Sequence, residues 1–324
     1  MMQRVENPDS SSGTVRARVA LGKVALIIPT YEAARYWAAL SEGIRSQSLV
    51  PDRVIVIDSS SSDGTAELAR SDGFEVVAIS PQDFNHGGTR QMGADYAGEA
   101  EILIYLTQDA VPFGRDAFAN LVSTFADAEI GAAYGRQLPR EKASAIEAHA
   151  RHFSYPATSR LRSWESRRTL GFKSIFFSNS FGAYRRSALM SVGGFSPDVI
   201  FGEDTLVVAR MHRAGWKTAY VAEAMARHSH AYSIAEEFRR YFDIGVLHAR
   251  ENWLVEQFGS ASGEGRRFVV SEMKHLAKNA PHLLPSAAMR TFAKYLGYKV
   301  GRSESGIAPR LKYHLGLNRQ YWSR

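Results

Sequence analysis

Continuous apolar runs and amphipathic segments alternate along the first third of the chain. Apolar runs at 24–28, 54–57 and 102–106 are typical of strands covered on both faces, and a weaker run at 74–79 extends the series. Segments with helical periodicity lie between these runs. Strands that alternate with helices predict right-handed parallel crossovers. The pattern therefore predicts an α/β fold built on a largely parallel sheet.

Polar residues follow these strands, and the carboxyl ends of parallel strands meet at one edge of a sheet. The strand at 54–57 leads into Asp58, four serines and Asp63. Open α/β sheets bind nucleotides at this edge, so the segment predicts a nucleotide site. Another interpretation gives Asp58 a turn role and makes Asp63 the N-cap of the next helix. The neighbouring polar segments are Pro29-Thr30-Tyr31-Glu32 and Thr107-Gln108-Asp109.

The segment from Phe84 to Arg90 precedes a helical pattern that runs through Tyr96. Its two adjacent glycines allow the backbone to come close to a ligand, and a helix N-terminus favours negative charge. Arg90 adds a forked, permanently charged donor suited to phosphate. We therefore expect a phosphate-binding loop at 85–90.

Two later motifs carry ionisable side chains. Glu203 and Asp204 open a helical pattern, where they either complement the helix dipole or supply a base. The glycines and proline at 193–197 suit a loop that lines a cleft. His228 and His230 are two positions apart in an extended segment, so both side chains point the same way. Such a pair is compatible with a metal site or with an ordinary surface.

In their order and spacing, these motifs resemble those of family 2 glycosyltransferases of the GT-A type, and among them bacterial rhamnosyltransferases. The resemblance covers about residues 22–235. It implies a Rossmann-like nucleotide-sugar-binding domain with a mixed, mainly parallel central sheet and a C-terminal helical appendage. The implied activity is inverting transfer of a sugar, L-rhamnose from dTDP-β-L-rhamnose, to a hydroxyl of a lipid-linked cell-surface glycan such as an O-antigen. The motifs are Pro29-Thr30-Tyr31, Asp58 to Thr65, Phe84 to Arg90, Thr107 to Ala110, Gly202-Glu203-Asp204 and His228 to Ser233.

The resemblance also implies roles for single residues. Asp204, next to Glu203, would be the general base. The family's metal-binding Asp-x-Asp motif has Thr107 in its first position here, so Asp109 is its one acidic ligand. A divalent cation, Mg²⁺ or Mn²⁺, on Asp109 therefore needs a further ligand. We expect this ligand to be one of the two histidines, His228 or His230. The residues expected to bind the donor nucleotide are Pro29, Thr30, Tyr31, Glu32, Asp58, Ser60, Asp63, Asn85, His86, Gly87, Arg90 and Gln108.

Two other functions fit parts of the pattern. One is a family 2 transferase that uses a UDP-hexose or UDP-N-acetylhexosamine donor. The other is a non-catalytic nucleotide- or glycan-binding module. Such a module has no need of a base, so Asp109, Glu203, Asp204 and the two histidines favour an enzyme.

Composition and charge restrict the cellular compartment and the surfaces that the protein can contact. The chain has 324 residues and no cysteine, so disulfides are excluded and a reducing cytoplasm is permitted. No run approaches the ~18 apolar residues of a membrane span. Residues 264–324 carry 12 basic and 3 acidic side chains, whereas the whole chain has a net charge of +7. With its interleaved aromatics, this tail suits peripheral contact with an anionic membrane, here the inner face of the cytoplasmic membrane, or a solvated helical face. No nucleic-acid-binding motif accompanies the charge.

The same features divide the chain. We expect residues 1–20 to form a disordered polar leader and 21–258 a GT-A catalytic domain, with a nucleotide-binding half at about 21–112 and an acceptor half at about 113–258. Residues 259–324 form the expected basic helical appendage, because 259–265 resembles a linker. Helical patterns begin at Ser233 and cover 268–279 and 287–300.

Overall fold

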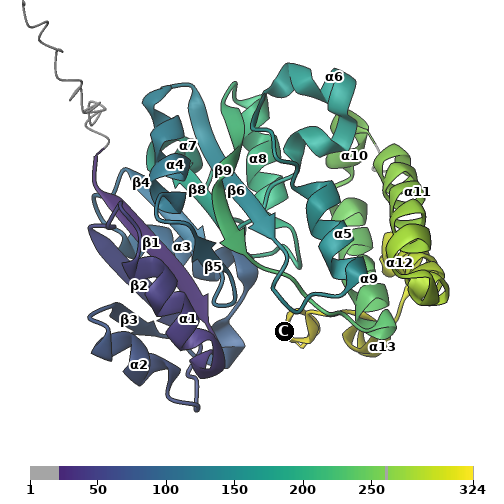
Figure 1. The fold of residues 1–324 in the computed structure, drawn as a ribbon, viewed down its shortest axis with the longest axis horizontal. Coiled ribbons are helices and arrows are strands. Elements are labelled where there is room, and N and C mark those ends of the chain that lie inside the picture. Colours follow the sequence, from purple (N-terminus) through teal and green to yellow (C-terminus); the bar gives the residue numbers. More distant parts are fainter. Residues whose placement is uncertain (1–21, 260–261, 324) are drawn as a thin grey trace, which may run out of the picture.

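The computed structural model describes residues 22–259 and 262–323, and its centre is a nine-stranded mixed sheet (Figure 1). The order along the sheet is β3-β2-β1-β4-β8-β6-β9-β5, with β7 also paired to β9. The strands are β1 (Val24–Thr30), β2 (Arg53–Asp58), β3 (Glu75–Ala78), β4 (Ile102–Leu106), β5 (Val111–Phe113), β6 (Ile130–Leu138), β7 (Arg160–Arg162), β8 (Phe181–Arg185) and β9 (Lys217–Arg227).

Strand β8 determines how the two halves of the sheet join. It runs antiparallel to β4 on one side and to β6 on the other, whereas β1 to β4 are parallel to one another where they pair, as are β6 and β9. Leu106 at the end of β4 lies opposite Phe181 at the start of β8. The segment before β8 therefore lies at the same edge as the carboxyl ends of β4 and β6. The mixed, mainly parallel sheet agrees with the predicted fold class.

Helices cover both faces of the sheet and build two apolar cores. Successive residues of β1 point to opposite faces, so that Ala25 and Ile27 join one core while Leu26 and Ile28 join the other. The helices are α1 (Ala34–Arg45), α2 (Thr65–Ser71), α3 (His86–Tyr96), α4 (Ala117–Ser123), α5 (Ala145–Ser154), α6 (Arg167–Leu170), α7 (Arg186–Ser191), α8 (Glu203–Arg213), α9 (Ile234–Arg250), α10 (Asn252–Phe258), α11 (Ser262–Asn279), α12 (Leu284–Arg302), α13 (Pro309–Leu315) and α14 (Arg319–Trp322).

Helix α3 starts earlier than the sequence pattern indicated. The prediction of a loop at 85–90 was wrong, because the Asn85 side chain accepts from the Gly88 amide and caps a helix that begins at His86. Gly87 therefore lies in the first turn. A Cβ atom at Gly87 would lie 1.8 Å from the Ser196 carbonyl oxygen, so this glycine lets the helix touch the loop that leads to α8.

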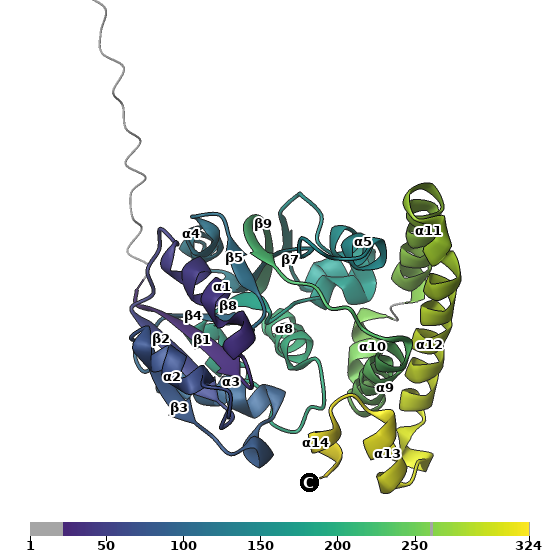
Figure 2. The same cartoon turned by 60° about the horizontal axis from the view of Figure 1, so that its bottom comes forward.

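Helix α12 lies along α9 and helix α11 beside α5, at the far side of the molecule from β1 to β3 (Figures 1 and 2). Cβ atoms at Gly297 and Gly301 would lie 2.2 and 2.1 Å from the carbonyl oxygens of Phe238 and Phe242, so the backbones of α12 and α9 are in direct contact. Of the predicted linker, residues 262–265 form the first turn of α11, and 260–261 lie outside the described residues. The predicted leader at 1–20 lies outside them as well, and the division at 259 stays a prediction.

None of the helices in the described ranges combines the length and the apolarity that crossing a bilayer requires.

Candidate active site

Two loops at the carboxyl ends of β1 and β2 are held together by buried hydrogen bonds. Asp58 is only 1% exposed and accepts from the Thr30 hydroxyl (2.9 Å) and from the Ser61 amide (2.8 Å) and hydroxyl (2.6 Å). Gln108, in the loop after β4, pairs twice with the backbone of Tyr31, accepting from its N–H at 2.7 Å and donating to its carbonyl at 3.0 Å. Three strands thus present one continuous polar edge.

Local backbone strain marks the same edge. Glu32 and Ser60 have φ values of 50° and 54°, and they are the two non-glycine residues of the described chain with positive φ. Such a conformation costs on the order of 1–2 kcal/mol per residue, and here it is held by hydrogen bonds: the Glu32 carboxylate accepts from the Ser62 amide, and the Ser60 hydroxyl donates to the Ile79 carbonyl. Strain of this kind is concentrated at functional sites.

Asp63 has a capping role that differs from a simple N-cap. The N-cap position of α2 is Gly64, in a left-handed conformation. Asp63 accepts instead from the Thr65 hydroxyl and amide and, at 2.9 Å, from the Ala34 amide of α1. It therefore ties the starts of two helices together, and the predicted contact with a nucleotide stays a prediction, as it does for the other residues of this edge.

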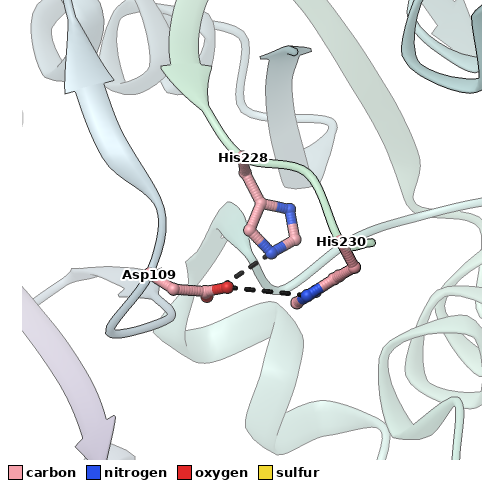
Figure 3. A group of neighbouring side chains, drawn as sticks. All are labelled: Asp109, His228 and His230. Atoms are coloured by element: carbon pink, nitrogen blue, oxygen red, sulfur yellow. Dashed lines mark ion pairs between the residues drawn. The ribbon is translucent and has the colours of Figure 1, made fainter. Parts of the chain in front are cut away.

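Asp109, His228 and His230 point toward one another from the loop after β4 and from the extended segment after β9 (Figure 3). His228 Nε2 lies 3.4 Å and His230 Nδ1 3.7 Å from the oxygens of Asp109. The three ligand atoms lie within 4.8 Å of one another, so a single ion can reach all of them. The structure thus brings together the residues predicted to bind metal, and both histidines belong to the cluster.

Gln137 fixes the tautomer of His228. The Gln137 Oε1 atom accepts from Arg151 at 2.5 Å, and it also faces His228 Nδ1 at 2.9 Å. Because this oxygen only accepts, Nδ1 of a neutral His228 carries the proton and Nε2 keeps its lone pair. That lone pair faces the carboxylate of Asp109, so the two groups can both be ligands of one cation. The side chains therefore fit a metal ion, with Gln137 as the group that orients one ligand.

The charge states in the cluster also suit metal binding. Burial lowers the pKa of His230 to about 3 and lowers that of His228, so both imidazoles are neutral at pH 7. Burial opposes ionisation of Asp109, but the pKa of Asp109 nevertheless lies below its ordinary value, so this carboxylate is anionic at pH 7. Arg140 Nη2 lies 3.1 Å from the same carboxylate. Two neutral nitrogens and one anionic oxygen are thus available to a cation.

A second acidic group lies at the start of α8, where Glu203 and Asp204 follow Gly202. Glu203 is 6% exposed, forms an ion pair of 3.3 Å with Arg90, and accepts from Asn179 Nδ2 at 3.0 Å. Arg90, predicted to meet a phosphate, is itself buried beside this carboxylate, and its contact with phosphate stays a prediction. His86 lies next to Arg90, and its Nε2 atom is 3.0 Å from Asn318 Oδ1, at hydrogen-bond distance.

The two neighbouring carboxylates have opposite pKa shifts. Burial and the negative charge of Glu203 raise the pKa of Asp204 to about 7. For Glu203, burial acts in the same direction, but the positive charge of Arg90 outweighs it and lowers the pKa. The partly exposed Asp204 accepts from the Asn179 amide at 3.1 Å. Because the pKa values of the two carboxyl groups are shifted apart, Glu203 is a permanent anion and Asp204 exchanges a proton near neutral pH.

Two hydrogen bonds of Gln137 and the peptide bond between Ser178 and Asn179 link the cluster of Asp109, His228 and His230 to the carboxylate pair. Gln137 Nε2 donates to the Ser178 hydroxyl at 2.8 Å, and the next residue is Asn179. Sequence reasoning missed both Gln137 and Asn179, which lie at the end of β6 and before β8. An amide side chain after a short apolar stretch, 130–134 before Gln137 and 175–177 before Asn179, was the available signal, but only the sheet order shows that these segments meet.

The fold and the site together define a known class of enzyme. A family model described as glycosyltransferase like family 2 matches residues 22–242, and the chain belongs to this family. It is 45% identical over 302 residues to the O-antigen chain rhamnosyltransferase RfbN of Salmonella typhimurium, with 93% of this chain and 96% of that protein covered. It is 42% identical over 299 residues to the O-antigen chain rhamnosyltransferase WbaN of Salmonella anatum, with 92% and 95% covered.

Among solved structures, the mannosyltransferase PcManGT from Pyrobaculum calidifontis, in complex with GDP-Man and Mn²⁺, resembles the chain with a TM-score of 0.59. The sequence identity is 18%, with 87% of this chain and 86% of that chain covered, so the likeness shows the fold. The predicted family, fold class and enzyme class are thereby confirmed: the protein is a glycosyltransferase of the GT-A type.

We expect Asp109→Asn to abolish Mn²⁺ binding, because it removes the anionic ligand of the cluster. Gln137→Met should weaken binding by about 10- to 100-fold, since the tautomer of His228 is no longer fixed. The affinities are measured by titration calorimetry with Mn²⁺. His152→Gln, at an exposed position of α5, is the control and should bind Mn²⁺ as the wild type does. Equal affinities for all four proteins would contradict a metal site at Asp109.

Proposed function

We propose that the chain transfers L-rhamnose from dTDP-β-L-rhamnose to a hydroxyl of a lipid-linked cell-surface glycan, with inversion at the anomeric carbon. One observation carries the proposal: Asn179 holds the neighbouring carboxylates of Glu203 and Asp204, and Ser178 and Gln137 link this pair to a cluster of one aspartate and two histidines. The choice of sugar is supported by RfbN and WbaN, which are O-antigen chain rhamnosyltransferases.

Asp204 is the base in this reaction. Its ionised carboxylate takes the proton of the acceptor hydroxyl while the hydroxyl oxygen attacks the anomeric carbon from the face opposite the diphosphate. The bond between that carbon and the diphosphate oxygen breaks in the same step, and the nucleoside diphosphate leaves with the electron pair. The configuration inverts without a covalent intermediate. Base catalysis of this kind contributes roughly 10²–10⁴-fold to the rate.

Glu203 and Asp109 have supporting roles in the proposal. Glu203 stays ionised through Arg90, and its charge keeps the pKa of Asp204 near the working pH. When bound at Asp109, His228 and His230, a divalent cation would neutralise the charge that develops on the departing diphosphate. Two imidazole nitrogens in the ligand set favour a transition-metal ion such as Mn²⁺ over Mg²⁺.

The nucleotide is assigned to the strained edge formed by β1, β2 and the loop after β4. Carboxylate, hydroxyl and backbone groups suit the N–H and hydroxyl groups of a nucleoside. Asp58 and Gln108 hold that edge in place. Transfer from a UDP-hexose or a UDP-N-acetylhexosamine remains the alternative within the same fold. A non-catalytic binding module is disfavoured, because it has no use for a carboxylate whose pKa is near 7.

We further propose that α11, α12 and α13 contact an anionic membrane surface from the cytoplasmic side. Met289, Phe292, Tyr295 and Leu296 of α12 are 41–61% exposed and lie on one face of the helix. The exposed charged side chains in the described part of these helices are all basic, whereas Glu264, Glu272 and Glu304 are buried or partly buried. An apolar stripe with basic surroundings fits anionic lipid headgroups.

We expect dTDP-rhamnose with Mn²⁺ to raise the melting temperature more than UDP-glucose, UDP-galactose or UDP-N-acetylglucosamine does, because at equal concentration the ligand that binds the folded state more tightly stabilises it more. The measurement is a thermal shift assay at equal ligand concentrations, repeated with EDTA. A UDP-sugar that stabilises the protein as strongly would remove rhamnose from the proposal and leave the fold and family untouched.

The transfer rate should rise with pH through about 7 and then level off, because the base must be ionised and the pKa of Asp204 is raised to about 7. Asp204→Asn should keep donor binding and lower transfer by at least about 10²-fold. The pH dependence and the transfer rate of the variant are both measured by release of nucleoside diphosphate. Asp198→Asn, an exposed carboxylate in the preceding loop, is the control. Full turnover by Asp204→Asn would exclude Asp204 as the base.

We expect the double substitution Phe292→Ser with Tyr295→Ser to weaken vesicle binding by at least about tenfold, since each aromatic ring contributes about 1.5–3 kcal/mol when buried. Co-sedimentation with phosphatidylglycerol vesicles measures the effect, and phosphatidylcholine vesicles test the charge requirement. Tyr96→Ser on α3, at a site that is 50% exposed, is the matched control. If both proteins sediment like the wild type, the proposed surface is wrong.

A further inference from the structure

Three arginines surround the cluster of Asp109, His228 and His230, and each is linked to a different member of it. Arg140 Nη2 contacts Asp109 Oδ2 directly at 3.1 Å. Arg151 Nη1 donates to Gln137 Oε1 at 2.5 Å, and that oxygen contacts His228 Nδ1 at 2.9 Å.

Arg240 reaches His230 through an aromatic ring. Its guanidinium carbon lies 5.7 Å from the ring centre of Tyr232, and this ring lies 5.0 Å from that of His230. The three arginines come from three separate segments of the chain, namely the loop after β6, helix α5 and helix α9. Three cations therefore converge on one small group of side chains.

Two of these cations lack a counterion in the part of the chain that the structure describes. Within the described ranges, neither Arg151 nor Arg240 has a carboxylate at ion-pair distance. Arg240 lies over the rings of Phe201 and Tyr232, and both arginine residues are partly exposed. Glu237, whose charge acts on Arg240 through space, is itself paired with Lys294 at 3.4 Å.

Unpaired guanidinium groups beside a cation site are costly, because like charges repel at short range and a bound divalent ion adds to the repulsion. A bound anion of high charge relieves this repulsion among the cations. Arg is well suited to such an anion, since its planar fork donates two parallel hydrogen bonds to a phosphate group.

We infer that Arg240 and Arg151, together with Arg140, bind the diphosphate of the donor and of the departing nucleoside diphosphate. The inference rests on the proposed function and extends it by naming the side chains that hold the leaving group. Arg90 was the sequence-based candidate for this role, but its guanidinium lies 3.3 Å from Glu203, which satisfies its charge. The three other arginines act where negative charge grows as the sugar departs.

Arg240 gives the sharpest test, because its contacts are to rings and its replacement leaves the hydrogen bonds of Gln137 and Asp109 in place. Arg240→Ala should weaken dTDP binding by about 10- to 100-fold, the usual effect of losing a charged hydrogen bond. The affinity for dTMP, which lacks the second phosphate, should change much less. Arg240→Lys keeps the charge without the fork and should give an intermediate loss.

The dissociation constants are measured by titration calorimetry with Mn²⁺ on the full-length protein, after thermal midpoints have shown that the variants are folded. Arg239→Ala is the matched control: it removes the same charge from the same helix, but from a side chain whose charge acts on Glu236. We expect it to bind dTDP as the wild type does.

Three outcomes distinguish a failure of the diphosphate site from a failure of the proposed function. A selective loss of dTDP affinity in Arg240→Ala and Arg240→Lys supports the diphosphate site. Equal affinities of Arg240→Ala, Arg239→Ala and the wild type overturn it while the proposed transfer stands. If the wild type binds neither dTDP nor UDP, the proposed function fails, and the diphosphate site fails with it.

Discussion

The hydrogen bonds of Asn179 are the constraint on which the arrangement of the site depends. Its side chain donates to Glu203 and its backbone amide donates to Asp204, so one residue positions both carboxylates. The Tyr184 hydroxyl in turn donates to Asn179 Oδ1 at 2.8 Å, which fixes the orientation of the amide. Asn179 can do this only because β8 runs opposite to its neighbours and brings its amino end to the edge where the other strands end.

Burial then gives the two carboxylates different properties. Two neighbouring carboxylates in a poorly hydrated site cannot both ionise at little cost, and the protein resolves this by pairing Arg90 with Glu203. The proton therefore resides on Asp204 at slightly acidic pH. The same logic holds at the cluster of Asp109, His228 and His230, where burial keeps the imidazoles neutral and Gln137 directs a lone pair toward Asp109. In both places burial disfavours charge, and one neighbouring side chain selects the protonation state. This side chain is Arg90 for the carboxylate pair and Gln137 for His228.

Much of this molecule was accessible from its sequence, for a physical reason. Buried parallel strands appear as unbroken apolar runs, and the polar residues at their ends must share one edge, so Asp58, Asp109 and the Glu203–Asp204 pair were found from local pattern and motif. Gln137 and Asn179 were not, because their contacts depend on strand order between segments far apart along the chain. The partner of Arg90 was missed for the same reason. The start of α3 was a local error, since the capping by Asn85 was overlooked.

The contact between α12 and α9 has a mechanical consequence. Glycines at 297 and 301 place the two backbones against each other with no side chain between them, and Gly245 does the same from α9. Helices joined so closely cannot slide or tilt independently, because any shift drives carbonyl oxygens into Cα atoms. The backbone that presents the exposed stripe of α12 and the backbone of α9 that presents Arg240 consequently form one stiff unit. A lipid surface that holds this stripe would also fix the direction from which a tethered glycan enters the reaction centre.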